Sequence, residues 1–220
     1  MTVDIRVVDD PARAAAELLA GHAVGGAHLA LSGGTTVGKA YELAAQLRPD
    51  WADVQAWFGD ERVVPPDDER SNYRLVREKL LDALAVPPAV HPLRGDLPAK
   101  EAAALYDDEL EGVVLDLALN GIGADGHTAS LFPNAPGLEE RRRRAVAAEP
   151  GLDPFVQRVT MTPPMFGDSR LLVYLVAGEG KAEAVRRSLA GEPSADTPAS
   201  LVRGRTTVAL LDAAAASLLA

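Results

Sequence analysis

Short apolar runs alternate along the chain with longer segments rich in Ala, Leu, Glu and Arg. This alternation predicts strands that are joined by helices, as in βαβ units. We expect strands at 3–7, 27–31, 54–58, 113–119, 171–177 and 207–211. Helices are expected at about 11–21, 37–47, 71–84, 98–110 and 181–190, with an alanine-rich closing helix after the last strand.

Two strands differ in their expected exposure. Val3, Ile5 and Val7 alternate with polar residues, which predicts a half-exposed strand at the edge of the sheet. The continuous apolar run 171–177 predicts a central strand that is buried on both faces. No repeat or low-complexity linker divides the sequence, so we predict one α/β domain over 1–220, an open, mostly parallel, twisted Rossmann-like sheet with helices on both faces.

The composition excludes several classes of protein and of catalytic site. The 220 residues are 47% hydrophobic and 25% charged, which excludes a disordered or collagen-like chain. Without cysteine there is no disulfide scaffold, no cysteine-based zinc site and no thiol nucleophile. The histidines outside the glycine-rich segments show no metal-ligand spacing, and no Gly-x-Ser-x-Gly elbow of a serine hydrolase occurs.

The charge balance predicts which partners the protein lacks. A formal net charge of -10 disfavours binding to nucleic acid or to anionic lipid, and it argues weakly against an anionic substrate. The cationic run 141–144 follows two glutamates and is interpreted as a solvated face. No stretch is long and apolar enough to span a membrane, and the acidic start is unlike a signal peptide, so we expect a cytoplasmic protein.

A glycine loop follows the second expected strand. Ser32, Gly33, Gly34, Thr35 and Thr36 stand between this strand and a helix. Glycines let backbone N–H groups approach an anion, and the helix N-terminus adds a positive partial charge. The loop can bind a phosphate or can be an ordinary tight turn; it is not a Walker A loop, because no Gly-Lys-Ser/Thr ending follows.

A second glycine-rich segment follows the strand at 113–119. Residues 121–126 match the letters of a dinucleotide-binding fingerprint, but Pro133 leaves little room for the long helix that this fingerprint needs. His127 comes next and is placed like a general base, since a histidine titrates near neutral pH. Asp125 can orient the imidazole, although Asp-Gly is also a common turn pair and a lone histidine is more often structural.

Several charged residues complete the candidate set. Asp60 and Arg62 lie in a charged segment after the strand at 54–58 and can bind a sugar hydroxyl and an anionic group, or can form a solvated loop. Arg158 and Lys181 are candidate phosphate ligands or surface cations. The carboxyl ends of parallel strands share one edge of a sheet, so we expect the glycine loop, the charged segment and the segment around His127 to converge on one site.

Taken together, these segments resemble the 6-phosphogluconolactonase family. The resemblance rests on 31–36, on 57–65 with Ser71-Asn72, on 120–133, on 158–162, on 178–181 and on the terminal Leu211-Asp212, and so spans the whole chain. Both this family and the glucosamine-6-phosphate deaminases commonly have a proline after the first loop, where this chain has Val37. We expect that difference to affect the start of the helix rather than the hydrogen-bond donors.

The deaminase family is the nearest alternative. It typically has Asp-Glu-Tyr where this chain has Asp60-Glu61-Arg62, and Phe-Asn-Glu-Pro where this chain has 130–133, which lacks the glutamate. The lactonase resemblance implies hydrolysis of 6-phospho-D-glucono-1,5-lactone to 6-phosphogluconate in the oxidative pentose phosphate pathway. A sugar-phosphate-binding regulator without catalysis is a second alternative.

The resemblance also implies roles for individual residues. His127 would act as general base and Asp125 would hold its ring. The substrate would bind to Gly33, Gly34, Thr35, Thr36, Asp60, Arg62, Gly126, Arg158 and Lys181, and the oxyanion would bind to amides of 121–126 or to Arg62. We expect no cofactor and no metal, a phosphosugar lactone as the small-molecule partner, no nucleic acid or membrane partner, and a monomer or small homo-oligomer.

Overall fold

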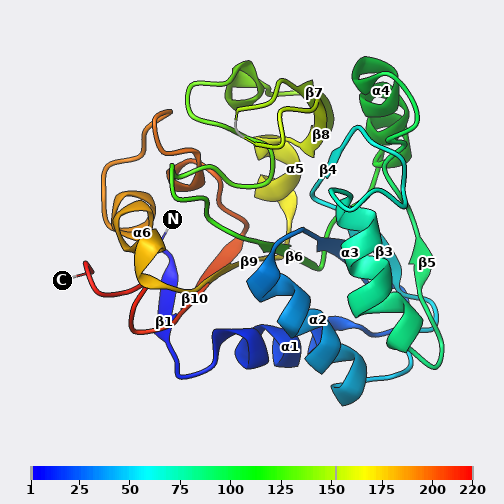
Figure 1. Cartoon of the computed structure of the whole chain (residues 1–220), viewed down its shortest axis with the longest axis horizontal. Coiled ribbons are helices and arrows are strands. Elements are labelled where there is room, and N and C mark those ends of the chain that lie inside the picture. Colours follow the sequence, from blue (N-terminus) through cyan, green and yellow to red (C-terminus); the bar gives the residue numbers. More distant parts are fainter. Residues whose placement is uncertain (1, 152, 220) are drawn as a thin grey trace.

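The computed structural model describes residues 2–151 and 153–219. Seven parallel strands form the main sheet, as Figure 1 shows. In spatial order they are β1 (Asp4–Val7), β10 (Thr206–Leu211), β9 (Leu171–Val176), β6 (Leu117–Asn120), β2 (His28–Leu31), β3 (Gln55–Phe58) and β5 (Ala89–Val90). The fold predicted from the sequence, an open α/β sheet, is confirmed.

Helices cover both faces of this sheet. α1 (Pro11–His22), α2 (Thr35–Leu47) and α3 (Asn72–Lys79) lie on one face, and α4 (Ala99–Glu109), α5 (Pro163–Asp168) and α6 (Ala182–Leu189) lie on the other (Figure 1). The arrangement follows from right-handed crossovers, because the first three connections step toward β5 and the later ones step back toward β1. The chain therefore changes direction between the neighbouring strands β2 and β6, which is where such folds bind ligands.

Side-chain caps start two of the helices. Asp10 caps α1 by accepting a hydrogen bond from the Arg13 amide at 3.0 Å, and Pro11 occupies the first helical position. Ser71 caps α3 in the same way through the Arg74 amide, at 3.2 Å. The helix expected to run to residue 84 ends at Lys79 and continues as a 3-10 turn, Leu81–Ala83.

The core fills both sides of the sheet with aliphatic side chains and a few large aromatic ones. β9 is buried along its length from Leu172 to Val176, as predicted for a central strand. β1 is at the edge, as predicted, but all four of its residues are exposed, so it is not half-buried. None of the helices in the described ranges is long and apolar enough to cross a membrane.

Two buried tyrosines hold the strand ends that lead into the site. The Tyr41 hydroxyl bonds to both the amide and the carbonyl of Ser32, each at 2.8 Å, directly after β2. The Tyr106 hydroxyl does the same for Phe58 at the end of β3, at 2.7 and 3.1 Å. Each phenol supplies one donor and one acceptor, which a backbone group at the end of a strand needs.

A second, antiparallel sheet has no counterpart in the sequence prediction. It consists of β4 (Asp60–Arg62), β8 (Arg158–Met161) and β7 (Ala145–Ala148). The interpretation of 60–62 as a solvated charged loop is therefore wrong, because Asp60 and Glu61 are buried. The Glu61 carboxylate accepts hydrogen bonds from the amides of Arg62, Asn72 and Tyr73, each at 2.7 Å, which offsets the cost of its burial.

The expected alanine-rich closing helix is also wrong. Residues 213–218 form turns in which Ser217 and Leu219 donate to carbonyls three residues back. Asp212 holds the start of this segment by accepting from the Ala215 amide at 2.7 Å and from the Gly178 amide at 3.0 Å. So short a segment gains little from helical propagation, and this capping contact ties it to the loop after β9 instead.

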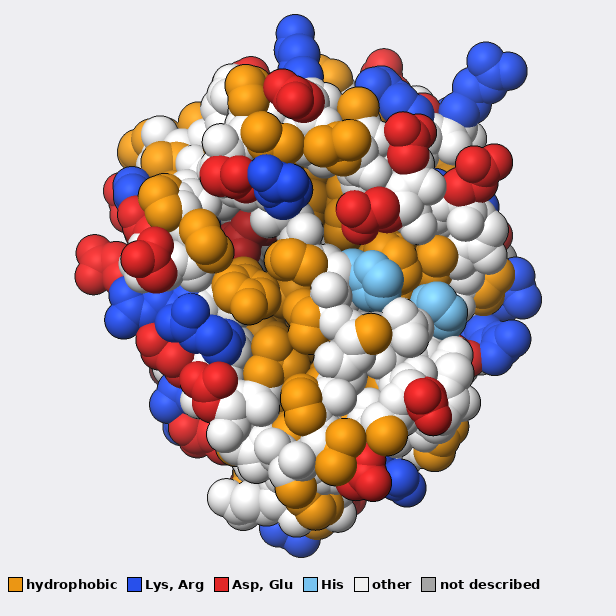
Figure 2. All heavy atoms as spheres, turned by 90° about the vertical axis from the view of Figure 1, so that its right-hand side faces the viewer, with side chains coloured by type: hydrophobic (Ala, Val, Ile, Leu, Met, Phe, Trp, Pro, Cys, Tyr) orange, Lys and Arg blue, Asp and Glu red, His pale blue; other side chains and the backbone are white. Residues whose placement is uncertain are grey.

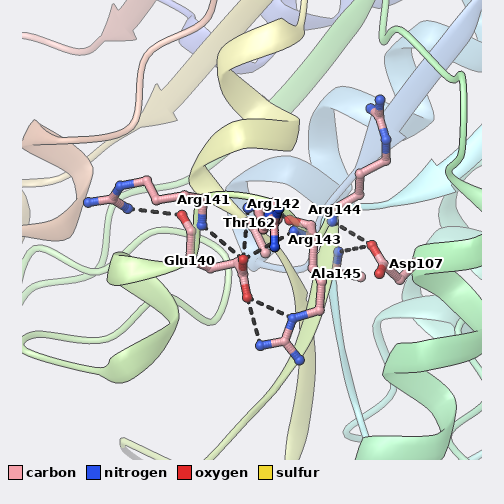
Figure 3. A network of polar contacts seen from close by, with 8 residues as sticks. All are labelled: Asp107, Glu140, Arg141, Arg142, Arg143, Arg144, Ala145 and Thr162. Atoms are coloured by element: carbon pink, nitrogen blue, oxygen red, sulfur yellow. Dashed lines mark hydrogen bonds and ion pairs between the residues drawn. The ribbon is translucent and has the colours of Figure 1, made fainter.

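The arginine run is built around two acids, as Figure 3 shows. One Glu140 oxygen accepts from the three successive amides of Arg141–Arg143, and these bonds hold the pKa of Glu140 down to about 2. Asp107 accepts from the Arg144 amide at 2.5 Å. The prediction of a solvated face is confirmed for Arg141–Arg143, whereas Arg144 is half-buried and donates to the Val113 carbonyl.

The side of the molecule that carries α3, α4 and β5 faces the viewer in Figure 2. Hydrophobic side chains form a band across this face, with charged side chains on both sides of it (Figure 2). A cavity of about 390 Å³ opens there, lined by Glu61, Val64, Pro66, Ser71, Tyr73, Pro92, Leu93, Arg94, Gly95 and Asp96. Strand β4 thus separates two cavities, because Asp60 and Arg62 line the one described next.

Candidate active site

A cavity of about 350 Å³ lies at the carboxyl ends of β2, β3 and β6. Three segments meet there, as the sequence predicted: the glycine loop after β2, strand β4 after β3, and the loop after β6. Its lining comprises Ser32, Gly33, Gly34, Thr35, Thr36, Val37, Asp60, Arg62, Asn72, Gly121, Ile122, Gly123, His127, Ala129, Arg158, Leu175, Val176, Ala177 and Lys181.

The glycine loop presents the N-terminus of α2 to the cavity. Gly34 caps the helix with φ +126°, a backbone conformation that L side chains rarely adopt. A Cβ on Gly33 would lie 2.0 Å from Oδ1 of Asn72, so only glycine fits beside that amide. Thr35 and Thr36 are the first two helical residues, and their amides belong to the orphan donors of a helix start. The helix begins here although Val37 stands where the two families commonly have a proline.

Two arginines face each other across β4 and β8. Arg62 is the register partner of Arg158, and both line the cavity. Burial and the neighbouring charge of Arg62 lower the pKa of Arg158, while Asp60 and Glu61 act in the opposite direction. Lys181 lines the same cavity from the 3-10 turn Glu179–Lys181, directly before α6. Three cations from three segments therefore line the cavity beside the loop that is predicted to bind an anion.

Asp60 anchors a buried polar network on one wall of the cavity. Its Oδ2 accepts from the Ser130 hydroxyl at 2.6 Å, and its Oδ1 accepts from the Asn72 side-chain amide at 3.1 Å. The same Asn72 nitrogen donates to the Asp60 carbonyl at 2.9 Å, which fixes the orientation of the Asn72 amide. Asn72 also lines the cavity, although the sequence indicates it only as part of the Ser71-Asn72 motif.

The loop after β6 is a turn and not the start of a helix. The Gly126 amide donates to the Gly123 carbonyl at 2.9 Å, and the Gly123 amide donates to the His127 carbonyl at 2.8 Å. Gly126 has φ +92°, and a Cβ there would lie 2.8 Å from Cγ2 of Thr197. No helix follows before the 3-10 turn Pro136–Glu139, so the rejection of the dinucleotide fingerprint is consistent with the local fold.

His127 and Asp125 form a tight pair at this turn. Nδ1 of His127 lies 2.5 Å from Oδ1 of Asp125, and the same oxygen accepts from the His127 amide at 3.0 Å. Burial alone would raise the pKa of Asp125, but the hydrogen bonds from His127 outweigh it and hold this pKa at about 2. A Cβ on Gly123 would lie 2.0 Å from Nδ1, so the imidazole rests directly on the glycine backbone.

The predicted site residues thus fall into two groups. Gly33, Gly34, Thr35, Thr36, Asp60, Arg62, His127, Arg158 and Lys181 line one cavity. Asp125 and Gly126 do not line it; the first holds the His127 ring and the second shapes the turn. Among the residues that the structure describes, none of the His, Asp and Glu side chains form a group of three or more suited to a metal ion.

Known proteins share both the sequence pattern and the fold. The family model described as glucosamine-6-phosphate isomerases/6-phosphogluconolactonase matches residues 5–210. The 6-phosphogluconolactonase of Homo sapiens is 39% identical over 206 residues, which cover 87% of this chain and 80% of the human protein. The chain therefore belongs to the glucosamine-6-phosphate isomerases/6-phosphogluconolactonase family.

Solved structures of both a lactonase and a deaminase resemble this fold. The crystal structure of 6-phosphogluconolactonase from Thermotoga maritima is 29% identical, with a TM-score of 0.83 over 96% of this chain and 100% of that chain. A monomeric glucosamine-6-phosphate deaminase gives a TM-score of 0.85 at 22% identity over 99% of this chain and 100% of that chain. At that identity the likeness concerns the fold alone, so the site residues must separate the two activities.

Proposed function

We propose that this protein is a 6-phosphogluconolactonase, a hydrolase that opens 6-phospho-D-glucono-1,5-lactone with water to give 6-phospho-D-gluconate in the oxidative pentose phosphate pathway. One observation carries the proposal: His127, whose ring is held by Asp125, lines the same cavity as the three cations Arg62, Arg158 and Lys181. Such a cavity can hold an anionic group at one end and an electrophilic carbon near the imidazole.

The Asp125 contact sets the tautomer of His127. Because the pKa of Asp125 is about 2, its carboxylate is ionised at neutral pH and can only accept a hydrogen bond. Nδ1 of His127 therefore carries the proton, and Nε2 holds the lone pair. A neutral imidazole in this tautomer can take a proton from water, a role that contributes about 10²–10⁴-fold in rate.

The proposed reaction needs one base and two sequential steps. Water attacks the lactone carbonyl carbon while Nε2 of His127 takes its proton, which forms a C–O bond and a tetrahedral oxyanion. The oxyanion then re-forms the carbonyl, the bond from this carbon to the ring oxygen breaks, and the ring oxygen takes a proton from the imidazolium. The product is an open-chain carboxylic acid, which ionises in water. Asp125 stabilises the imidazolium between the two steps.

We assign the substrate phosphate to the cationic side of the cavity. The amides at the start of α2 and the guanidinium groups of Arg62 and Arg158 are donors suited to phosphate oxygens. Lys181 adds a third positive charge. The amides of Gly123 and Gly126 already donate within the turn, so these two are not free to bind the oxyanion. Asp60 is assigned to sugar hydroxyls, because it lines the same cavity.

One contact favours the lactonase over the deaminase. The side chain packed beside the imidazole is Phe132, with ring centroids 5.2 Å apart. Phe132 falls at the position where the deaminase pattern has its glutamate, so a ring that cannot exchange protons replaces the acid that deamination would use with the histidine. Hydrolysis of a lactone, whose carbonyl carbon is already electrophilic, does not need that second acid.

The cellular setting is part of the proposal. We place the reaction in the cytoplasm and propose that the enzyme acts as a monomer or small homo-oligomer, without a cofactor, a metal, a nucleic acid or a membrane as partner. The acidic composition supports the absence of a polyanionic partner, because its net charge of -10 repels one.

The deciding experiment compares two substrates on the purified chain. Consumption of 6-phosphogluconolactone is measured against its spontaneous hydrolysis, and ammonia release is measured with glucosamine 6-phosphate. We expect lactone opening and no ammonia. Ammonia release without lactone opening would replace the proposal by the deaminase, and binding of 6-phosphogluconate without either reaction would favour a regulator.

A further inference from the structure

Phe132 connects the two chemical ends of the cavity. Its ring lies beside the His127 imidazole, with ring centroids 5.2 Å apart and a 45° angle between the planes. The Arg158 guanidinium carbon lies 5.6 Å from the centroid of the same ring. Cations within about 6 Å of an aromatic centroid are attracted by the ring, and more strongly when they are shielded from water. His127 and Arg158 both line the cavity, whereas Phe132 does not.

The burial of Phe132 differs from that of an ordinary core residue. Its side chain is only 4% exposed, yet it is not part of the continuous cluster of core side chains, to which its neighbour Leu131 belongs. The ring is therefore buried beside the site, where His127, Arg158 and the segment around Gly151 lie against it.

The backbone holds this ring from both sides. On the N-terminal side, the Ser130 amide donates to the Thr160 hydroxyl at 3.2 Å and the Ser130 hydroxyl donates to Asp60. On the other side, the segment before β8 packs so closely that a Cβ on Gly151 would lie 2.4 Å from Cγ of Phe132. The same segment supplies the Pro154 carbonyl, which accepts from Nη2 of Arg158 at 3.2 Å.

We propose that Phe132 is a positioning residue that fixes the spacing between the general base and the phosphate-binding guanidinium. This inference rests on the proposed function, because it assigns the two ends of one substrate to the two side chains that the ring contacts. Since a substrate with a phosphate at one end and a lactone at the other spans a set distance, holding both protein groups on one rigid ring preorganises them for it. The ring also excludes water from this side of the imidazole.

The test separates the two contacts by using two substrates. Phe132→Leu keeps an apolar side chain but removes the ring. For 6-phosphogluconolactone we expect a higher KM and a lower kcat, with kcat/KM falling about ten-fold or more, the size of a lost shielded cation–π contact. For glucono-1,5-lactone, which has no phosphate, we expect kcat to fall while KM stays unchanged. Affinity for 6-phosphogluconate, measured by calorimetry, should fall as KM rises.

Three further variants decide between positioning and simple destabilisation. Phe132→Tyr retains the ring and should recover most of the lost kcat/KM. Gly151→Ala retains the Phe132 side chain but should displace its ring, and we expect the same increase in KM. This variant takes the place of Phe132→Leu if the latter does not fold. Phe166→Leu is the matched control, because Phe166 is fully buried in the core cluster, whereas the ring beside His127 and Arg158 is that of Phe132; it should lower the melting temperature without changing KM.

Each result has a defined meaning. Wild-type kcat and KM in Phe132→Leu on both lactones would overturn the positioning role, as would an equal change in KM in Phe166→Leu. If the wild-type chain opens no lactone, the proposed function fails instead. In that case an unchanged affinity of Phe132→Leu for 6-phosphogluconate overturns the Arg158 contact separately, and a reduced affinity supports it.

Discussion

Arg62 on β4 lies directly opposite Arg158 on β8, in register within an antiparallel pair of strands. Like charges in this arrangement destabilise a sheet, and the charge of Arg62 indeed adds to burial in lowering the pKa of Arg158. We propose that an anion binds between the two guanidinium groups and offsets this repulsion. The neighbouring glycine loop and Lys181 make a phosphate the best match for this position.

Arg62→Ala should therefore weaken phosphate binding specifically. A hydrogen bond to a charged group contributes about 1.5–3 kcal/mol, so we expect KM for 6-phosphogluconolactone to rise roughly ten-fold or more. KM and kcat for glucono-1,5-lactone should change little. Initial rates with both lactones measure this, and an equal loss of kcat on both substrates would instead place Arg62 at the oxyanion.

His127→Ala should remove the base while leaving the phosphate site intact. We expect kcat to fall by about 10²–10⁴-fold and the affinity for 6-phosphogluconate to stay close to that of the wild type. Stopped-flow or pH-stat rates give kcat, and calorimetry gives the affinity. A rate near that of the wild type would exclude His127 from this role.

Asp125→Asn should show a smaller loss than His127→Ala. The asparagine can still accept from Nδ1 of His127, but it carries no charge to stabilise the imidazolium. Because the pKa of Asp125 is about 2, the wild-type carboxylate stays ionised above about pH 4, and any acidic limb of the rate profile above that pH belongs to another group. We therefore expect the pH–rate profile of Asp125→Asn to keep any acidic limb that the wild type shows above that pH. Disappearance of this limb in the variant would assign it to Asp125.

Gly33→Ala tests whether the first loop needs its backbone close to Asn72. The added Cβ would lie 2.0 Å from Oδ1 of Asn72, whose amide is held by Asp60, so the loop must move. We expect a raised KM for the phosphorylated lactone. Gly21→Ala is the matched control, because nothing lies within 4 Å of its Cβ and it sits in α1; there we expect unchanged kinetics and a stability gain of about 0.5–1 kcal/mol. Equal kinetics in both variants would contradict the argument.

The sequence was sufficient to predict the strands of the main sheet except β5, and the convergence of its loops. The continuous apolar run that becomes β9 is typical of a strand buried on both faces. Parallel strands bring their carboxyl ends to one edge, so the sequence alone predicts that Thr35, Arg62 and His127 lie together. These are consequences of local pattern and chain direction.

The small sheet could not be predicted in the same way. β4 has three residues, Asp60–Arg62, with three charges, and only its pairing with β8 and the hydrogen bonds to Glu61 make it a buried strand. Asn72 and Phe132 were missed as site residues for a related reason. Their roles depend on which way a side chain points after the chain has folded, and a single sequence contains no periodicity that reports it.

The stability of the fold should depend on pH through His91, which does not line the cavity of the site. Its ring stacks on Trp57 with centroids 3.8 Å apart and planes 5° apart, and Nε2 lies 2.8 Å from Oε1 of Gln55. Burial lowers the pKa of His91 below its ordinary value of 6.5, with Glu109 opposing this and His28 adding to it. The unfolded chain therefore takes up this proton at a higher pH than the folded chain.

It follows that neutral His91 contributes its full stability above pH 6.5, and that this contribution is lost as the pH falls below that value. His91→Phe keeps an aromatic ring beside Trp57 but has no titrating group. We expect the melting temperature of the wild type to fall more steeply between about pH 7.5 and about pH 5.5 than that of His91→Phe. Circular dichroism melts at both pH values measure the difference, and other titrating groups cancel because both proteins contain them. Parallel curves would show that His91 does not carry this pH dependence.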